Sequence, residues 1–107
     1  MSNPRRPNIV FVLTDDHAAN AIGCYGSVVN TTPGIDAIAA AGIRFDRALV
    51  ENALCTPSRA AFLTGTYSHT SSVTTLATHL TNDHETFITA LKAAGYRTLV
   101  VTVDANI

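Results

Sequence analysis

Asn8-Ile9-Val10-Phe11-Val12-Leu13-Thr14 is the stretch that decides the fold, because it is a continuous apolar run rich in β-branched residues. Such a run is typical of a strand that is covered on both faces, as in a parallel sheet. It stops at Asp15-Asp16-His17, and turn-forming residues follow as far as Gly34. Two further apolar runs, 43–50 and 96–103, are predicted to be buried strands of the same kind.

Three helices are predicted between these strands, at 35–41, 57–64 and 85–94. Each is followed by a glycine that can end a helix, at Gly42, Gly65 and Gly95. The segment 66–83 is rich in Thr, Ser and His without a clear period and is predicted to be loop. Strands that alternate with helices predict an α/β fold with a largely parallel sheet. Because the faces and edges of such a sheet need covering, the sequence is interpreted as an incomplete domain.

The composition narrows the class of protein. Hydrophobic residues make up 47% of the 107 residues and charged residues 14%, which indicates a globular, core-forming chain. A net charge of −1 without a basic block gives no electrostatic footprint for nucleic acid. No apolar run approaches the length of a membrane span, and no secretory signal is recognised near Met1. The sequence as written is therefore expected to be cytoplasmic, or periplasmic or secreted if the start has been misassigned.

The segment Cys55-Thr56-Pro57-Ser58-Arg59 carries the most chemical information. Pro57 suits a first helical turn and Thr56 is a natural N-cap, so Cys55 is predicted to sit just ahead of a helix amino terminus. Unpaired N–H groups and the positive end of the helix dipole favour an anion there. Arg59, one turn along, adds a planar cation that can hold a tetrahedral oxyanion by two bonds. A cysteine-derived group beside such a cradle suits the transfer of a sulfuryl or phosphoryl group, although a lone cysteine would usually be a packed thiol.

Asp15 and Asp16 fall where the first predicted strand ends, the edge at which open α/β sheets place their ligand sites. Neighbouring side chains of a strand point to opposite faces, so two adjacent carboxylates serve one ion only where the strand gives way to a loop. Two hard oxygen ligands without nearby sulfur suit Ca²⁺ or Mg²⁺ better than zinc. The alternative is an Asp-Asp turn that merely ends the strand, and these two residues taken alone favour that alternative.

Two motifs together resemble the formylglycine-dependent sulfatases of the alkaline-phosphatase-like superfamily. They are Pro7-Asn8-Ile9-Val10 leading to the two aspartates, and C-x-P-S-R followed by Thr64-Gly65. The similarity continues over nearly the whole chain, to about Val101. It implies that residues 1–107 are the amino-terminal, incomplete part of a sulfatase catalytic domain. The expected fold is a partial alkaline-phosphatase-like sandwich, with a largely parallel sheet and flanking helices.

The resemblance also implies the roles of the site residues. Cys55 would be oxidised by a formylglycine-generating maturation enzyme to Cα-formylglycine, an aldehyde whose hydrate attacks the sulfur and then expels sulfate. Arg59 would be the electrostatic partner of that hydrate. Asp15, Asp16 and the group derived from Cys55 would bind Ca²⁺ or Mg²⁺.

The expected function is therefore hydrolysis of a sulfate ester, with a sulfated sugar as a candidate substrate. In the family, Tyr-Arg-Thr and a short apolar run are normally followed by Gly-Lys-Trp-His, whose lysine and histidine contact the sulfate. This chain instead reads Thr102-Val103-Asp104 and onward, so the polypeptide alone is expected to be inactive. Two alternatives stay open: a phosphate or phosphonate ester hydrolase of the same superfamily, and a non-catalytic truncated remnant.

Other polar residues are weaker candidates. His69 resembles a position where many sulfatases have histidine, and His17 beside the aspartates could orient a ligand or be a solvated loop residue. Cys24 is predicted to be a packed thiol in a turn, and Asp36 a helix amino-terminal charge.

Overall fold

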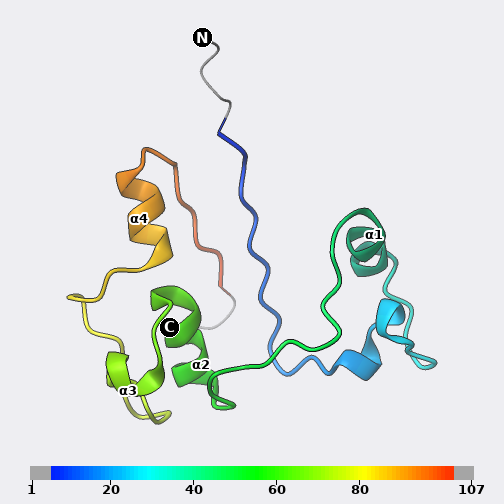
Figure 1. The fold of residues 1–107 in the computed structure, drawn as a ribbon, viewed down its shortest axis with the longest axis horizontal. Coiled ribbons are helices and arrows are strands. Elements are labelled where there is room, and N and C mark those ends of the chain that lie inside the picture. Colours follow the sequence, from blue (N-terminus) through cyan, green and yellow to red (C-terminus); the bar gives the residue numbers. More distant parts are fainter. Residues whose placement is uncertain (1–5, 103–107) are drawn as a thin grey trace. The chain divides into compact units, whose positions relative to one another are not determined.

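The computed structural model describes residues 6–102, which belong to two compact units with their boundary between Arg47 and Ala48. The first unit contains helix α1 (Pro33–Ala41). The second contains α2 (Cys55–Thr64), α3 (Ser68–Ser71) and α4 (Phe87–Ala93) (Figure 1). Within residues 6–102, no helix is long and apolar enough to cross a membrane.

The first unit is organised around the start of α1. Two short 3-10 helices, η1 (Ala19–Ala21) and η2 (Gly23–Tyr25), lie in the predicted loop, and η2 contacts α1. Asp36, in the first turn of α1, accepts hydrogen bonds from the backbone N–H of Cys24 at 2.7 Å and from the hydroxyl of Thr32 at 3.0 Å. The Thr32 hydroxyl in turn accepts the N–H of Gly23 at 2.8 Å. Asp36 is therefore more than the helix-end charge predicted for it, because its carboxylate also fixes η2 onto α1.

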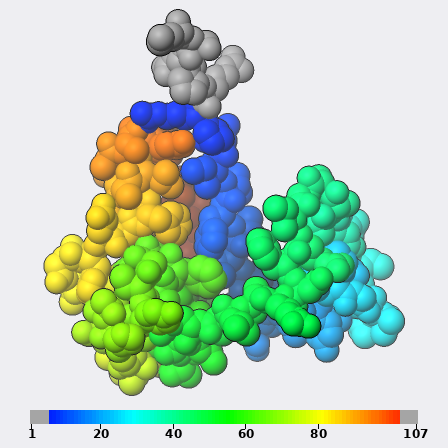
Figure 2. All heavy atoms as spheres, in the orientation of Figure 1, coloured from blue at the N-terminus to red at the C-terminus, as the bar shows by residue number. Residues whose placement is uncertain are grey.

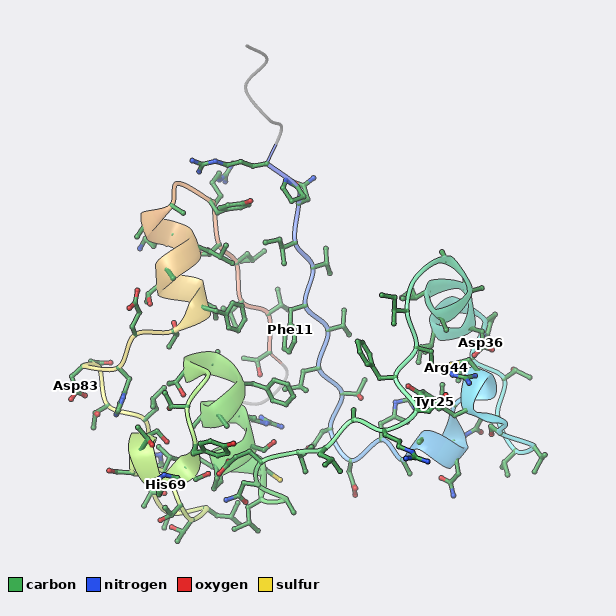
Figure 3. All side chains as sticks on the ribbon, in the orientation of Figure 1. Phe11, Tyr25, Asp36, Arg44, His69 and Asp83 are labelled. Carbon is green, nitrogen blue, oxygen red and sulfur yellow. The ribbon has the colours of Figure 1, made fainter. Side chains whose placement is uncertain are left out.

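A second set of contacts in this unit involves Arg44 and Tyr25, which are both labelled in Figure 3. The guanidinium of Arg44 lies 5.4 Å from the centre of the Tyr25 ring and donates to the carbonyl oxygen of Cys24. The Tyr25 hydroxyl donates to the carbonyl of Phe45 at 2.9 Å. These contacts hold the segment that follows α1 against η2.

The second unit has its small core where α2 meets α3. Val73 and Pro57 are the largest side chains with almost no exposed surface, and Ala60, Ser68 and Ser71 are also buried. Atoms of α2 and α3, both green in the space-filling view, are in contact (Figure 2). Helix α2 also contacts α4. The α2 helix is therefore the element on which the other two helices of this unit pack.

Helix ends follow the predicted chemistry at several points. Gly65 ends α2 with a left-handed φ of 66°, and its N–H donates to the carbonyl of Ala61. Gly95, with φ of 88°, follows α4 in a Schellman arrangement, in which Gly95 N–H donates to Lys92 and Tyr96 N–H donates to Leu91. Both positions require a residue that tolerates positive φ.

The three predicted helices are confirmed with small shifts at their ends. The first begins at Pro33 rather than Ile35, and the last spans Phe87–Ala93 rather than 85–94. The prediction of continuous loop over 66–83 is wrong, because α3 lies within it. Four residues are too few to show a helical period, so sequence spacing could not reveal this turn.

The predicted strands are not confirmed. Residues 8–14, 43–50 and 96–102 are outside any helix, but no strand is assigned to the part of the chain that the structure describes. Residues 6–14 run as an extended trace without a strand arrow (Figure 1). A strand requires a hydrogen-bonded neighbour as well as the right side chains, and only the side chains are encoded locally. The last predicted strand residue, Val103, and the departure at 103–107 lie outside the described residues.

Candidate active site

Cys55 is the first residue of α2, and its side chain is exposed. The N-cap is Leu54, whose carbonyl accepts the N–H of Ser58 at 2.9 Å. The prediction that Thr56 caps the helix is therefore wrong by two residues, and Cys55 lies inside the first turn rather than ahead of it. The first turn still carries backbone N–H groups without intrahelical partners, so the electrostatic argument for an anion at this helix end stands.

Arg59 lies one turn after Cys55 in the same helix. Residues four apart in an α-helix share a face, with roughly 5–6 Å between their Cβ atoms. Arg59 is half-buried, whereas Cys55 is exposed. Between them Pro57 is almost fully buried against the unit, which fixes the rotation of the helix about its axis. The structure therefore brings the predicted nucleophile and its predicted cationic partner to one face of α2.

Asp15 and Asp16 form a bend at the end of the extended segment. Asp16 has a φ of 44°, in the left-handed region that aspartate tolerates better than most residues. Both side chains are exposed. The positive φ of Asp16 breaks the alternation that an extended segment would impose on the two side chains.

The two predicted halves of the site lie in different units. Asp15 and Asp16 belong to the first unit, and Cys55 and Arg59 belong to the second. Among residues 6–102, no group of three or more His, Cys, Asp or Glu side chains is placed to hold a metal ion. The joint metal set of Asp15, Asp16 and Cys55 therefore stays a prediction.

Sequence reasoning missed two residues next to the cysteine helix, Glu51 and Asn52. The Glu51 carboxylate accepts the N–H of Ser68 at 3.0 Å and its hydroxyl at 2.7 Å. These bonds to Ser68, the backbone one first, lower the pKa of Glu51. Asn52 donates to the Ser68 hydroxyl at 3.2 Å and accepts the N–H of Leu54 at 2.9 Å. The short sequence Glu-Asn before the motif gave no signal, because its partner is about seventeen residues away.

The weaker candidates have local explanations. His69 stacks on Tyr67, with ring centres 5.6 Å apart, and its side chain projects from α3 (Figure 3). His17 is exposed in the segment after the aspartates, and Cys24 is a half-buried free thiol in η2, as predicted for a packed turn cysteine.

Comparison with known proteins decides the family. Residues 7–104 match the family model described as Sulfatase. The chain belongs to the sulfatase family. Residues of this sulfatase chain are 46% identical over 97 positions to N-acetylglucosamine-6-O-sulfatase of Bacteroides thetaiotaomicron, an alignment that covers 91% of this chain and 17% of that protein. Human steryl-sulfatase is 38% identical over 107 positions, with 90% of this chain and 18% of that protein covered.

A solved structure shares the fold of this sulfatase chain. It is the structure of BT4656 in complex with its substrate D-glucosamine-2-N,6-O-disulfate, which matches with a TM-score of 0.84 and 47% sequence identity. The match covers 87% of this chain and 19% of that one. The sulfatase chain thus spans about a fifth of the length of the relatives it matches. The family resemblance drawn from the two motifs is confirmed.

Proposed function

We propose that residues 1–107 are the amino-terminal part of a sulfatase catalytic domain that hydrolyses sulfate esters. The observation that carries the proposal is Cys55 at the first position of α2, with Arg59 on the same helical face, in a chain of the sulfatase family. The 1–107 segment would supply the nucleophile and part of a cation site. The strand segments 8–14, 43–50 and 96–103 would pair in the parallel sheet of the complete domain.

Cys55 is the residue that a formylglycine-generating enzyme would oxidise. Its hydrated aldehyde supplies one hydroxyl to form the new sulfur–oxygen bond as the alcohol leaves, and a second hydroxyl whose deprotonation expels sulfate. Cys55, exposed at the first position of α2, would present this group to a substrate, while the backbone N–H groups of the first turn would face developing negative charge. Arg59 would hold the sulfate oxygens by charge-assisted hydrogen bonds.

The side chains of Asp15 and Asp16 are of the chemical type that binds a hard divalent cation. Their carboxylates are exposed, consecutive and set at a bend where Asp16 takes positive φ. Oxygen ligands of this type suit Ca²⁺ or Mg²⁺, and such a cation would neutralise charge on the sulfate oxygens. With the group derived from Cys55 they would form three members of a larger ligand set.

A sulfated amino sugar is the substrate class that the comparisons favour. One of the relatives described above is an N-acetylglucosamine-6-O-sulfatase, and the solved structure holds D-glucosamine-2-N,6-O-disulfate as its substrate. Both match this chain at more than 45% identity. We therefore propose a 6-O-sulfated hexosamine as the first substrate to test.

Modification of Cys55 is tested by mass spectrometry after co-expression with a formylglycine-generating enzyme. The peptide that contains Cys55 should carry an aldehyde in place of its thiol. Cys24 is an internal control, because it lacks the following proline and arginine and should keep its thiol. The P57A and R59A variants separate recognition of the motif from general oxidation. An intact Cys55 thiol in the wild-type chain would contradict the proposal.

Substrate class is tested in a full-length sulfatase that carries this segment. N-acetylglucosamine-6-sulfate, an aryl sulfate and an aryl phosphonate are compared in wild-type and C55A enzymes. We expect sulfate-ester hydrolysis that C55A abolishes. Dominant phosphonate cleavage would favour the phosphoryl alternative, and no turnover of any ester by a modified wild-type enzyme would favour a non-catalytic remnant.

A further inference from the structure

A cluster of three polar side chains lies beside the cysteine helix. Ser68 begins α3 and is only 5% exposed. Its hydroxyl donates to the Glu51 carboxylate at 2.7 Å and accepts from the Asn52 side-chain amide at 3.2 Å, while its backbone N–H donates to Glu51 at 3.0 Å. We call Glu51, Asn52 and Ser68 the serine clamp. Every polar atom of the buried Ser68 side chain is thereby satisfied.

The serine clamp reaches the residue that precedes the predicted nucleophile. The side-chain oxygen of Asn52 accepts the N–H of Leu54 at 2.9 Å. Leu54 is the N-cap of α2, and its carbonyl accepts the first intrahelical hydrogen bond, from Ser58. A continuous hydrogen-bonded path therefore runs from α3 through Asn52 to the backbone that carries Cys55.

The clamp contains a charged acceptor, which makes it stronger than an ordinary turn. Two hydrogen bonds converge on one carboxylate, and bonds to an ionised group are about twice as strong as neutral ones. The carboxyl end of α2 is closed by the left-handed Gly65, while Pro57 in the first turn and Ala60 in the middle of the helix are buried. The start of the helix, where Cys55 is exposed, is therefore held by the burial of Pro57 and, on the side of the preceding residues, by the hydrogen bonds of the clamp to α3.

We propose that Glu51, acting with Asn52 and Ser68, is a positioning residue for the catalytic group formed from Cys55. The inference rests on the proposed function, because it assumes that Cys55 becomes the nucleophile. The clamp holds the first turn of α2 against α3, so that the nucleophile and Arg59 keep their mutual geometry during the reaction. Glu51 touches neither substrate nor cation in this role.

The test compares E51A, E51Q and E85A in a full-length sulfatase that carries this segment. E51A removes both hydrogen bonds to Ser68, while E51Q keeps an oxygen that can accept the Ser68 N–H. Glu85 precedes α4 in the same unit, outside the clamp, so E85A is the matched control. Rates are divided by the formylglycine content of each sample, measured by mass spectrometry, so that altered modification is not counted as altered catalysis.

We expect E51A to lower kcat by roughly tenfold with KM within about twofold of wild type, because misplacement of a nucleophile affects the chemical step more than binding. The kcat of E51Q should lie between those of E51A and wild type, and the kcat of E85A should equal that of wild type. Hydrogen exchange of the Leu54 and Ser68 amides should accelerate in E51A and stay unchanged in E85A, which reports the clamp independently of activity.

Two results would overturn the inference while leaving the proposed function intact. One is a modified and active E51A enzyme with wild-type kcat, and the other is a change confined to KM. If the wild-type protein carries no formylglycine and hydrolyses no sulfate ester, the proposed function fails, and the positioning role fails with it.

Discussion

At the scale of single residues, Gly23 shows how closely η2 is fitted to α1. A Cβ atom added at Gly23 would lie 2.4 Å from a carboxylate oxygen of Asp36, the residue that accepts the Cys24 N–H. We expect G23A to lower the free energy of unfolding by about 1–3 kcal/mol, because Asp36 must move and lose hydrogen bonds. Urea unfolding measures the change.

Gly34 is the matched control for that substitution. It lies in α1, and no atom lies within 4 Å of a Cβ built on it. G34A should leave stability unchanged or raise it by up to about 1 kcal/mol, since alanine favours helix. Equal destabilisation by G23A and G34A would show that the Asp36 contact does not fix η2.

Also at this scale, the pairing of Cys55 with Arg59 could be predicted from the sequence, whereas the serine clamp beside them could not. The motif is contiguous, so a helical period puts Cys55 and Arg59 on one face without knowledge of the fold. Glu51 meets Ser68 only because α2 turns the chain back between them. Contacts of that kind depend on tertiary packing, which local spacing does not encode.

At the scale of elements, α4 begins with a reciprocal cap. The Thr86 hydroxyl accepts the N–H of Thr89 at 3.1 Å, and the Thr89 hydroxyl accepts the N–H of Thr86 at 2.9 Å. We expect T86A to destabilise α4 by about 1 kcal/mol, and T86S to retain most of the wild-type stability. Amide exchange along α4 distinguishes them, and identical exchange in both variants would contradict a role for the cap.

Helix α3 should respond to pH through Glu51. The pKa of Glu51 is lowered by its hydrogen bonds to Ser68, so the ionised form is favoured in the folded state. Its stabilising contribution is present above the pKa of the unfolded chain and is lost as pH falls through the lowered folded pKa. The charge of His69, which follows Ser68 in α3, lowers the pKa of Glu51 by a smaller amount.

An NMR titration of the Glu51 carboxyl group tests whether its pKa is lowered in the folded protein. The midpoint should lie below that of an unstructured glutamate, and S68A should move it upward because one of the two hydrogen bonds is removed. A midpoint in S68A equal to that of wild type would mean that Ser68 is not the cause.

The predicted helices are confirmed and the predicted strands are not, for a physical reason. Helix α4 is capped by Thr86 at its start and ended by Gly95, so both of its ends can be predicted from nearby residues. Residues 8–14 carry the side chains of a strand, but its hydrogen bonds belong to another segment of backbone. Over the described part of the chain no such ladder is assigned.

At the scale of the whole molecule, apolar side chains are exposed along the predicted strands. Val10 is 85% exposed and Val12 77% exposed within a run whose backbone is extended. Such a segment is a template for pairing with another chain. We expect residues 1–107 on their own to self-associate, and V10K to weaken the association several-fold because lysine disfavours edge-to-edge pairing.

Sedimentation velocity over a range of concentrations measures that association. V28K is the control, because Val28 is 97% exposed outside the predicted strands and the substitution adds the same charge. If V28K and V10K weaken association equally, net charge rather than strand pairing is responsible. A wild-type chain that stays monomeric at every concentration would contradict the prediction altogether.

The accessibility of Cys55 has a practical consequence for anyone who prepares this protein. An exposed thiol can couple to the same residue of a second molecule in air, whereas an aldehyde at that position has no sulfur with which to do so. On a gel run without reductant, a covalent dimer joined through Cys55 can come only from chains in which this thiol has not been converted. A doubled band formed through Cys55 would therefore show that conversion in a batch is incomplete.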